Sequence, residues 1–164
     1  MPGSTMMSSS RAEAFLGLPD WARRITAQVE VSFHESLAGS WHPEGGGNDA
    51  LVTLELTSAA TSAQTLLDSG DMRASGTVQV QGLTRSAEVV GDRHVHWDSG
   101  RIDLRLRFTG DDGRPYRLVG GWSPARFPGC EREPFRLRLE TGEGEPAGDA
   151  VLFTAEPETT QARR

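Results

Sequence analysis

The sequence predicts a mostly β fold: a single antiparallel β-barrel of eight to nine strands, similar in layout to a lipocalin. An N-terminal helical arm and one short internal helix are expected to accompany it. Many short segments alternate apolar and polar side chains, which is typical of strands with one buried face. Turns rich in glycine and proline, which number 19 and 9, separate these segments. Barrel closure removes unpaired strand edges, and a two-sheet sandwich is the main alternative.

Composition excludes several classes of function. The net charge of −6 argues against a nucleic-acid partner, which needs a basic face. No apolar stretch approaches the length of a membrane span, so no membrane partner is expected. Cys130 is the single cysteine, which rules out an intrachain disulfide. Residues 1–10 lack a secretory pattern, and a cytoplasmic location is therefore expected. All 17 basic residues are arginine, which indicates GC-rich coding of the actinobacterial type.

The N-terminal region predicts an arm rather than a strand. In residues 1–24, a polar leader precedes Phe15, Leu18 and Trp21, which follow each other at helical spacing. The arm either packs on the outside of the barrel or forms a lid over its mouth, where Trp21 would contact a ligand. The barrel domain is then expected over residues 25–156, and residues 157–164 form a polar tail.

The first half of the domain predicts two strands and the helix. Phe33, Glu35 and Leu37 share one face of a strand that begins near residue 28, and a glycine-rich turn follows Trp41. A second strand is expected over 50–57 and a helix over 58–67. Thr57 or Ser58 would cap this helix, and Gly70 would end it.

The second half predicts strands and turns only. In 93–97, Val95 and Trp97 face inward, opposite His94 and His96. The clearest alternation covers 101–109, and a hairpin turn at 111–113 leads back along 115–122. A loop is expected over 123–133. The remaining strands are expected over 74–81, 83–90, 135–139 and 150–155.

Several segments carry a family resemblance. Residues 32–39 (SFHESLAG), 52–57 (VTLELT), 74–78 (ASGTV), 105–108 (RLRF) and 112–121 (DGRPYRLVGG) resemble the β domain of cholesterol-oxidase-like members of the glucose–methanol–choline oxidoreductases. This resemblance implies a β fold and a domain that accompanies an oxidoreductase. No Gly-x-Gly-x-x-Gly lies between a strand and a helix, so we expect no flavin and no other cofactor. The architecture is also similar to stand-alone Diels–Alderases of actinobacterial spirotetronate and spirotetramate pathways, which implies a cofactor-independent cyclase.

Glu35 is the first candidate catalytic residue. It lies on the apolar face of its strand, where a carboxylate is costly to bury without a partner. It could act as a general acid or base or hold a polar group of a ligand. The alternative is that the strand bends or ends there, which leaves Glu35 at the rim and paired with an arginine.

Aromatic residues near the strand ends are candidates for a ligand pocket. Tyr116 could supply a catalytic hydroxyl, and the others could line the pocket or simply fill the barrel, because a barrel of eight strands allows both. The expected ligand-binding residues, besides Trp21, are Phe33, Trp41, Trp97, Phe108 and Trp122.

Other chemically suggestive residues are expected to be structural. His94 and His96 have a metal-ligand spacing, but their outward direction favours a solvated face and no metal site. Cys130 lies beside Glu131, which disfavours a reactive thiolate. The outward arginines at 105, 107, 136 and 138 are expected to form a solvated surface.

Two functions remain open on the sequence. The first is a barrel that binds an apolar small molecule and acts as a cofactor-independent cyclase on a polyketide-like intermediate, mainly by orienting it and excluding water. The second is a non-catalytic ligand-binding or accessory barrel that partners an oxidoreductase. A homodimer is compatible with both.

Overall fold

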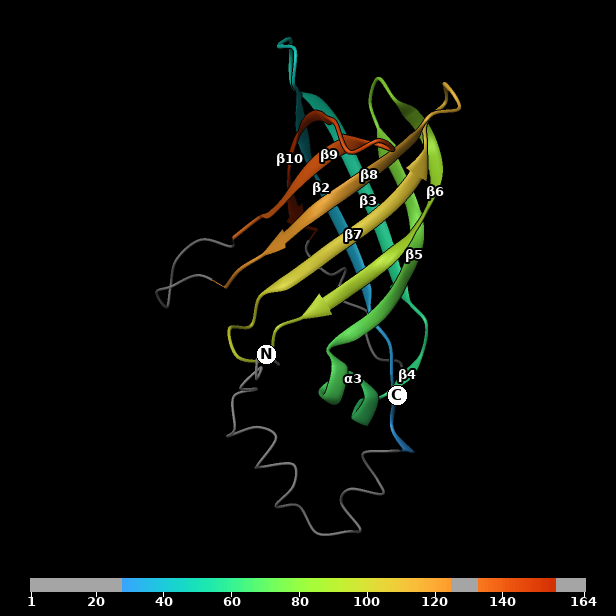
Figure 1. The fold of residues 1–164 in the computed structure, drawn as a ribbon, viewed down its shortest axis with the longest axis vertical. Coiled ribbons are helices and arrows are strands. Elements are labelled where there is room, and N and C mark those ends of the chain that lie inside the picture. The colour runs from blue at the N-terminus through green and yellow to red at the C-terminus, as the bar shows by residue number, and fades with distance from the viewer. Residues whose placement is uncertain (1–27, 125–132, 156–164) are drawn as a thin grey trace, which may run out of the picture.

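Eight antiparallel strands close into a barrel in the computed structural model, which describes residues 28–124 and 133–155 (Figure 1). Each barrel strand pairs with the barrel strands before and after it in the sequence, and the last pairs with the first, in the order β10-β2-β3-β5-β6-β7-β8-β9. The short strand β4 is not part of the barrel. The predicted barrel is therefore confirmed over the sandwich. The strands are β2 (His34–Pro43), β3 (Ala50–Ser58), β5 (Asp71–Val80), β6 (Thr84–Val95), β7 (Ile102–Thr109), β8 (Pro115–Trp122), β9 (Phe135–Thr141) and β10 (Pro146–Thr154).

The two ends of the barrel differ in their connections. Four short turns, over 44–49, 81–83, 110–114 and 142–145, gather at one end, here called the upper end. The other three connections, over 59–70, 96–101 and 123–134, lie at the opposite, lower end, and the first of them contains the helix α3 (Ala63–Ser69) (Figure 1). Two further strands, β1 (Glu30–Val31) and β4 (Thr61–Ser62), pair with each other in a small separate sheet. No helix in the described residues is long and apolar enough to cross a membrane.

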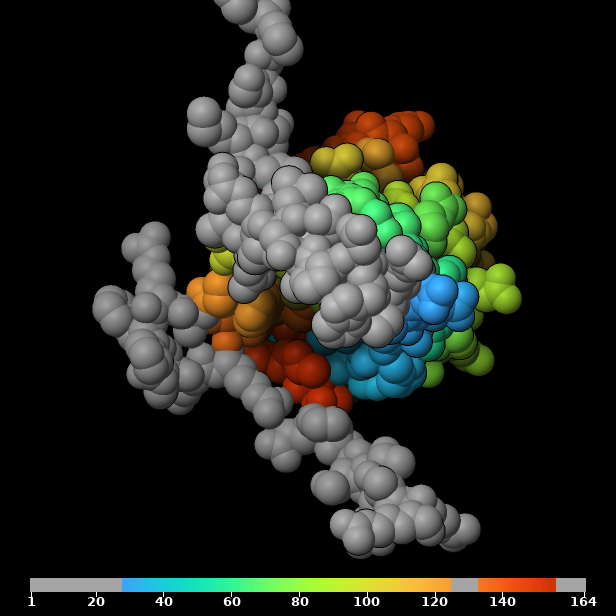
Figure 2. Space-filling view, turned by 90° about the horizontal axis from the view of Figure 1, so that it is seen from below, coloured from blue at the N-terminus to red at the C-terminus, as the bar shows by residue number. Residues whose placement is uncertain are grey.

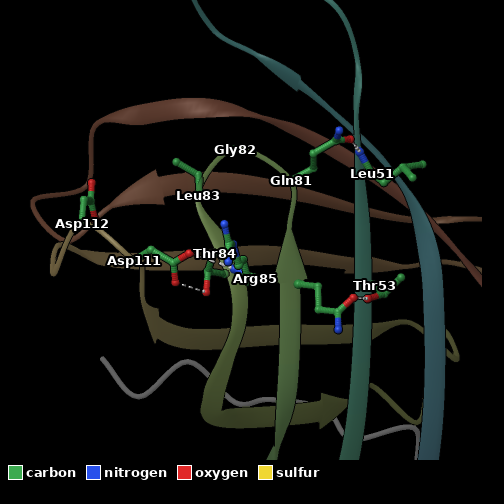
Figure 3. A pocket seen from close by; sticks show the side chains of 10 residues that line it. Leu51, Thr53, Gln81, Gly82, Leu83, Thr84, Arg85, Asp111 and Asp112 are labelled. Carbon is green, nitrogen blue, oxygen red and sulfur yellow. Dashed lines mark hydrogen bonds between the residues drawn. The ribbon is translucent and has the colours of Figure 1, made fainter.

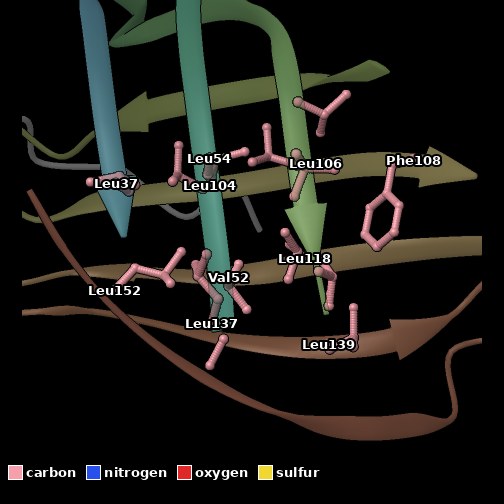
Figure 4. Packing of buried hydrophobic residues seen from close by; sticks show 14 of the residues in the cluster. Leu37, Val52, Leu54, Leu104, Leu106, Phe108, Leu118, Leu137, Leu139 and Leu152 are labelled. Atoms are coloured by element: carbon pink, nitrogen blue, oxygen red, sulfur yellow. The ribbon is translucent and has the colours of Figure 1, made fainter. Parts of the chain in front are cut away.

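Leucine and valine side chains fill the middle of the barrel. They come from the inward face of every strand, and Figure 4 shows how they meet in the interior. Each such side chain contributes about 1.5–3 kcal/mol on burial. Those with less than 2% of their surface exposed include Leu54, Leu56, Leu104, Leu106, Leu118, Leu139 and Leu152. Because these side chains have almost no exposed surface, the groups that a ligand could contact lie at the barrel ends and on the outer surface.

Glycines allow neighbouring strands to approach closely where the sheet curves. A Cβ added at Gly76 would lie 1.7 Å from the carbonyl oxygen of Glu55 on β3. One added at Gly91 would lie 1.9 Å from the carbonyl oxygen of Arg105 on β7. Both positions face inward, so only a residue without a side chain fits these close approaches.

The predicted helix over 58–67 begins too early. Ser58 belongs to β3, where it pairs with Ala74, and its Oγ accepts a hydrogen bond from the Phe33 amide at 2.8 Å. The helix therefore starts later, and the Ser62 Oγ caps it by accepting from the Thr65 amide at 3.1 Å. Gly70 ends it in the left-handed conformation with φ of 71°, as predicted.

Two strand predictions also needed correction. Residues 83–90 and 93–97 are not separate strands but one strand, β6, which continues through Gly91 and ends at Val95. Trp97 therefore lies beyond the strand. The first predicted strand is interrupted at Ser32 and Phe33, which separate β1 from β2. The predicted arm with Trp21, the environment of Cys130 and the polar tail lie outside the described residues.

Candidate functional site

Three aromatic residues of the predicted pocket fill the upper end of the barrel. The side chains of Trp41, Phe108 and Tyr116 are all buried. The rings of Phe108 and Tyr116 stack with their centroids 5.5 Å apart, and the Trp41 indole donates to the Gln81 carbonyl oxygen at 3.2 Å. These side chains therefore close the upper end rather than line an opening.

Tyr116 is bound to a carboxylate at this end. Its hydroxyl donates to Asp112 Oδ2 at 2.9 Å, within the turn that joins β7 and β8. Burial and the hydrogen bond to Asp112 both raise the pKa of Tyr116. The pKa of Asp112 is lowered by a hydrogen bond from the Arg114 amide and by the Tyr116 hydroxyl, which together outweigh desolvation. The pair holds the turn and leaves the hydroxyl committed to a partner.

A surface groove of about 870 Å³ lies outside the upper end (Figure 3). Its apolar side chains include Leu83 and Leu51, of which Leu51 is 69% exposed. Its polar side chains largely bind one another or nearby backbone: Gln81 accepts from the Leu51 amide and Thr84 donates to Asp111 (Figure 3). Because these polar groups are already partnered, this groove offers little to recognise a specific ligand.

An ion pair crosses the interior at the lower end. Glu35 on β2 and Arg93 on β6 both lie at inward positions, although β3 and β5 separate their strands. Arg93 Nη2 lies 3.0 Å from Glu35 Oε1. The two side chains are only 13% (Arg93) and 18% (Glu35) exposed. Glu35 is thus paired with an arginine near its strand's beginning, as one of the two sequence alternatives predicted.

Phe33 covers the guanidinium. The Arg93 Cζ lies 4.5 Å from the centroid of the Phe33 ring, which is a cation–π contact. The Phe33 backbone is held by its hydrogen bonds to Ser58, one of them from the Ser58 amide at 3.0 Å. The ring, the guanidinium and the carboxylate therefore form one half-buried polar site, here called the Glu35–Arg93 site.

Two polar atoms of this site have no hydrogen-bond partner among the described residues. They are Glu35 Oε2, an acceptor, and Arg93 Nε, a donor, and both are buried. A buried polar group left without a partner costs about 1–3 kcal/mol, and more when it is charged. A group that supplied one donor and one acceptor at this position would remove that cost.

The predicted site residues lie in two groups, one at each end of the barrel. The Trp122 indole, at the lower end, donates to the Glu133 carbonyl oxygen at 2.9 Å, and its ring lies 6.4 Å from that of Phe135. Trp97 was expected at an inward strand position, but it lies beyond the end of β6, and its indole donates to the Leu66 carbonyl oxygen of α3 at 3.1 Å. Phe33, Glu35 and Trp122 share the lower end, whereas Trp41, Phe108 and Tyr116 share the upper one.

Arg93 is the residue of the candidate site that the sequence pattern did not identify. Arg93 lies two residues before Val95 on the same strand, so both side chains point to the same face. Because Val95 is expected to point inward, the alternation also predicts an inward Arg93. What the pattern could not show is which of 17 arginines meets Glu35. That contact depends on barrel closure across two intervening strands.

The histidine pair forms carboxylate contacts. His94 contacts Asp71, His96 contacts Asp103 at 2.7 Å, and the two rings meet edge to face. Burial raises the pKa of Asp103, but hydrogen bonds and charges from His96 and Arg101 outweigh it and bring this pKa below its usual value. Across residues 28–124 and 133–155, no group of three His, Cys, Asp or Glu side chains could hold a metal ion.

The fold and the site together define a closed eight-stranded barrel with an inward Arg–carboxylate pair at one end. Figure 2 shows the molecule from below, which is the side of the lower end. Comparison of the chain with protein-family models, curated proteins and solved structures finds no match. Its function is therefore inferred from this geometry.

Proposed function

We propose that this protein binds a small, mostly apolar molecule at the lower end of the barrel. One polar group of the ligand would hydrogen-bond to Glu35 and Arg93. The observation that carries the proposal is the pair of buried, unpartnered atoms, Glu35 Oε2 and Arg93 Nε, on side chains that already face each other. Two groups fixed by an ion pair need little reorganisation on binding, which favours affinity.

The ligand's polar group follows from the two free atoms. The carboxylate oxygen accepts and the guanidinium N–H donates, so a hydroxyl or enol satisfies both at once. Hydrogen bonds to charged groups contribute about 1.5–3 kcal/mol each. Leu56 and Leu104, the strand partners of Glu35 and Arg93, are buried in the packed core. The apolar part of the ligand would therefore lie beside Phe33 and toward the lower end rather than in the barrel centre.

Cofactor-independent cyclisation is an extension of this proposal. An Arg93 N–H that donates to a substrate carbonyl would stabilise charge that develops on that oxygen during ring closure. Glu35 would hold the guanidinium in place. Bonds would rearrange within one substrate, so no oxidant or reductant is required. Tyr116 is at the opposite end of the barrel and takes no part in this version of the site. Binding without turnover would instead favour an accessory barrel, which is the alternative function.

A matched pair of probes tests binding. We expect 2-naphthol, which carries an aromatic ring and a hydroxyl, to bind at least about tenfold more tightly than naphthalene, since one hydrogen bond to a charged group contributes about 1.5–3 kcal/mol and about 1.4 kcal/mol corresponds to a factor of ten. Amide shifts in NMR spectra should concentrate at residues 33–35 and 93. The double variant Glu35→Leu/Arg93→Leu removes both charges and so avoids a lone buried ion.

The double variant should bind both probes equally, while Arg73→Gln, which removes an exposed arginine of β5, should keep the preference for 2-naphthol. Equal binding of the two probes to the unmodified protein, or shifts confined to Leu51 and Gln81 in the upper groove, would contradict the proposal. Catalysis is then measured with a linear polyene that carries an unsaturated ketone, and the double variant Glu35→Leu/Arg93→Leu should abolish its cyclisation while the protein stays folded.

A further inference from the structure

Arginines dominate one outer face of the barrel. The outward side chains of β7, β8 and β9 include five arginines and only two acids, Asp103 and Glu140, in a chain whose net charge is −6. The five are here called the basic face: Arg105, Arg107, Arg117, Arg136 and Arg138.

Most of these charges have no partner within the described chain. Both acids of these three strands are already engaged, Asp103 with Arg101 and His96, and Glu140 with Arg117 at 3.4 Å. On the flanking strands, Asp92 of β6 stands opposite Arg105 and pairs with Arg73, and Asp149 of β10 stands opposite Arg138. The other four arginines form no ion pair with any residue in 28–124 or 133–155, and all four are exposed. Arg107 stands directly opposite Arg117 across β7 and β8. Like charges in that position destabilise a sheet, so the arrangement costs stability in the free protein.

Beyond Arg117, the outward residues of β8, the middle strand of the basic face, are small and lie between two strands that carry arginines. Val119 on β8 lies between Arg105 on β7 and Arg138 on β9 in the strand register. Gly121 follows on the same face of β8 and has no side chain. A groove of about 530 Å³ runs from Val119 to Val151 on β10, and its charged lining residues are Arg136, Arg138, Glu140 and Asp149. An extended segment can thus lie over β8 with arginines on both sides.

We propose that the basic face binds an acidic polypeptide segment in extended conformation. Alternate side chains of an extended chain repeat every ~6.6 Å, which is also the repeat of Arg105 and Arg107 along their strand. Carboxylates at alternate positions would meet successive guanidinium groups, whose planar fork binds carboxylates with two parallel hydrogen bonds. The apolar side chains between them would contact Val119.

A single-stranded nucleic acid fits this face less well. Such polymers are bound through aromatic side chains on which bases stack, and the outward residues of β7, β8 and β9 include none. The overall charge of −6 also opposes a long polyanion more than a short segment that carries a few carboxylates.

Fluorescence anisotropy with a labelled alternating Glu–Thr peptide tests the proposal. In low salt we expect saturable binding that weakens as salt is added. The variant Arg105→Gln/Arg138→Gln should weaken this binding about tenfold, which corresponds to the loss of two charge-assisted contacts. The control Arg73→Gln/Arg114→Gln removes the same charge from exposed arginines elsewhere and should change binding by less than about twofold.

Three results would overturn the inference. The first is equal weakening in both double variants, which would indicate a non-specific charge effect. The second is equal binding of a Lys–Thr peptide. The third is tighter binding of an oligothymidine that carries the same number of charges, which would make nucleic acid the partner. Because all four substituted side chains are exposed, thermal unfolding of both variants should match that of the parent protein.

Discussion

Tyr116 can be followed individually because it is the only tyrosine of the chain. Its pKa is raised above 10.0 by burial and by its hydrogen bond to Asp112. Titration of tyrosinate absorbance should therefore give a midpoint above pH 10 in the folded protein, and Asp112→Asn should lower that midpoint. A raised pKa in the folded state means that this stabilisation is complete below the unfolded pKa and is lost as pH rises through the folded one. Equal midpoints in folded and denatured protein would contradict this assignment.

At the Glu35–Arg93 site, the sequence identified one partner and missed the other. Glu35 was evident because a carboxylate interrupts an apolar face, and the pattern along one strand is enough to show that. Arg93 was not evident because its role depends on a contact between strands that are neither adjacent in sequence nor paired in the sheet. Trp97 was misplaced because parity holds only while a strand continues, and β6 ends at Val95.

Among the elements, strands were more predictable than the boundaries between them. The strand over 102–109 shows period-two alternation throughout and was located to within one residue. The strand β6 was divided in two because Gly91 and Asp92 look like a turn in the sequence, whereas the glycine is required there by the close approach of β7. The Ser- and Thr-rich run 57–62 suits both a helix cap and a strand end. Pairing with β5, which the local sequence does not show, determines that β3 continues to Ser58.

Helix α3 depends on its ends rather than on a buried face. None of its residues is buried, and the Ser62 cap and Gly70 fix its two ends. Ser62→Ala should cost about 1 kcal/mol locally, which makes amide hydrogen exchange in 63–69 about fivefold faster. Exchange in the barrel strands should not change and serves as the internal control. A uniform acceleration through the barrel would show instead that α3 folds together with it.

For the whole molecule, barrel closure depends on strands that approach closely at glycines. Gly76→Ala places a methyl group against the Glu55 carbonyl oxygen, which must move for the side chain to fit. We expect a loss of about 3 kcal/mol in the free energy of unfolding, measured by urea denaturation. Gly45→Ala is the matched control, since its Cβ would meet nothing within 4 Å, and it should be close to neutral. A small effect of Gly76→Ala would mean that β3 and β5 can move apart at this point without a loss in the free energy of unfolding.

The difference between the two barrel ends has a consequence for how such a protein can change. The upper turns are short and tied to buried aromatic residues, so altering their length would disturb strand register. Two of the lower connections, 59–70 and 123–134, are longer than any upper turn and join barrel strands without a tight turn. Insertions and sequence exchange should therefore be tolerated there. In protein engineering, the lower rim is the place to graft new recognition loops, and the upper rim is the part to leave unaltered.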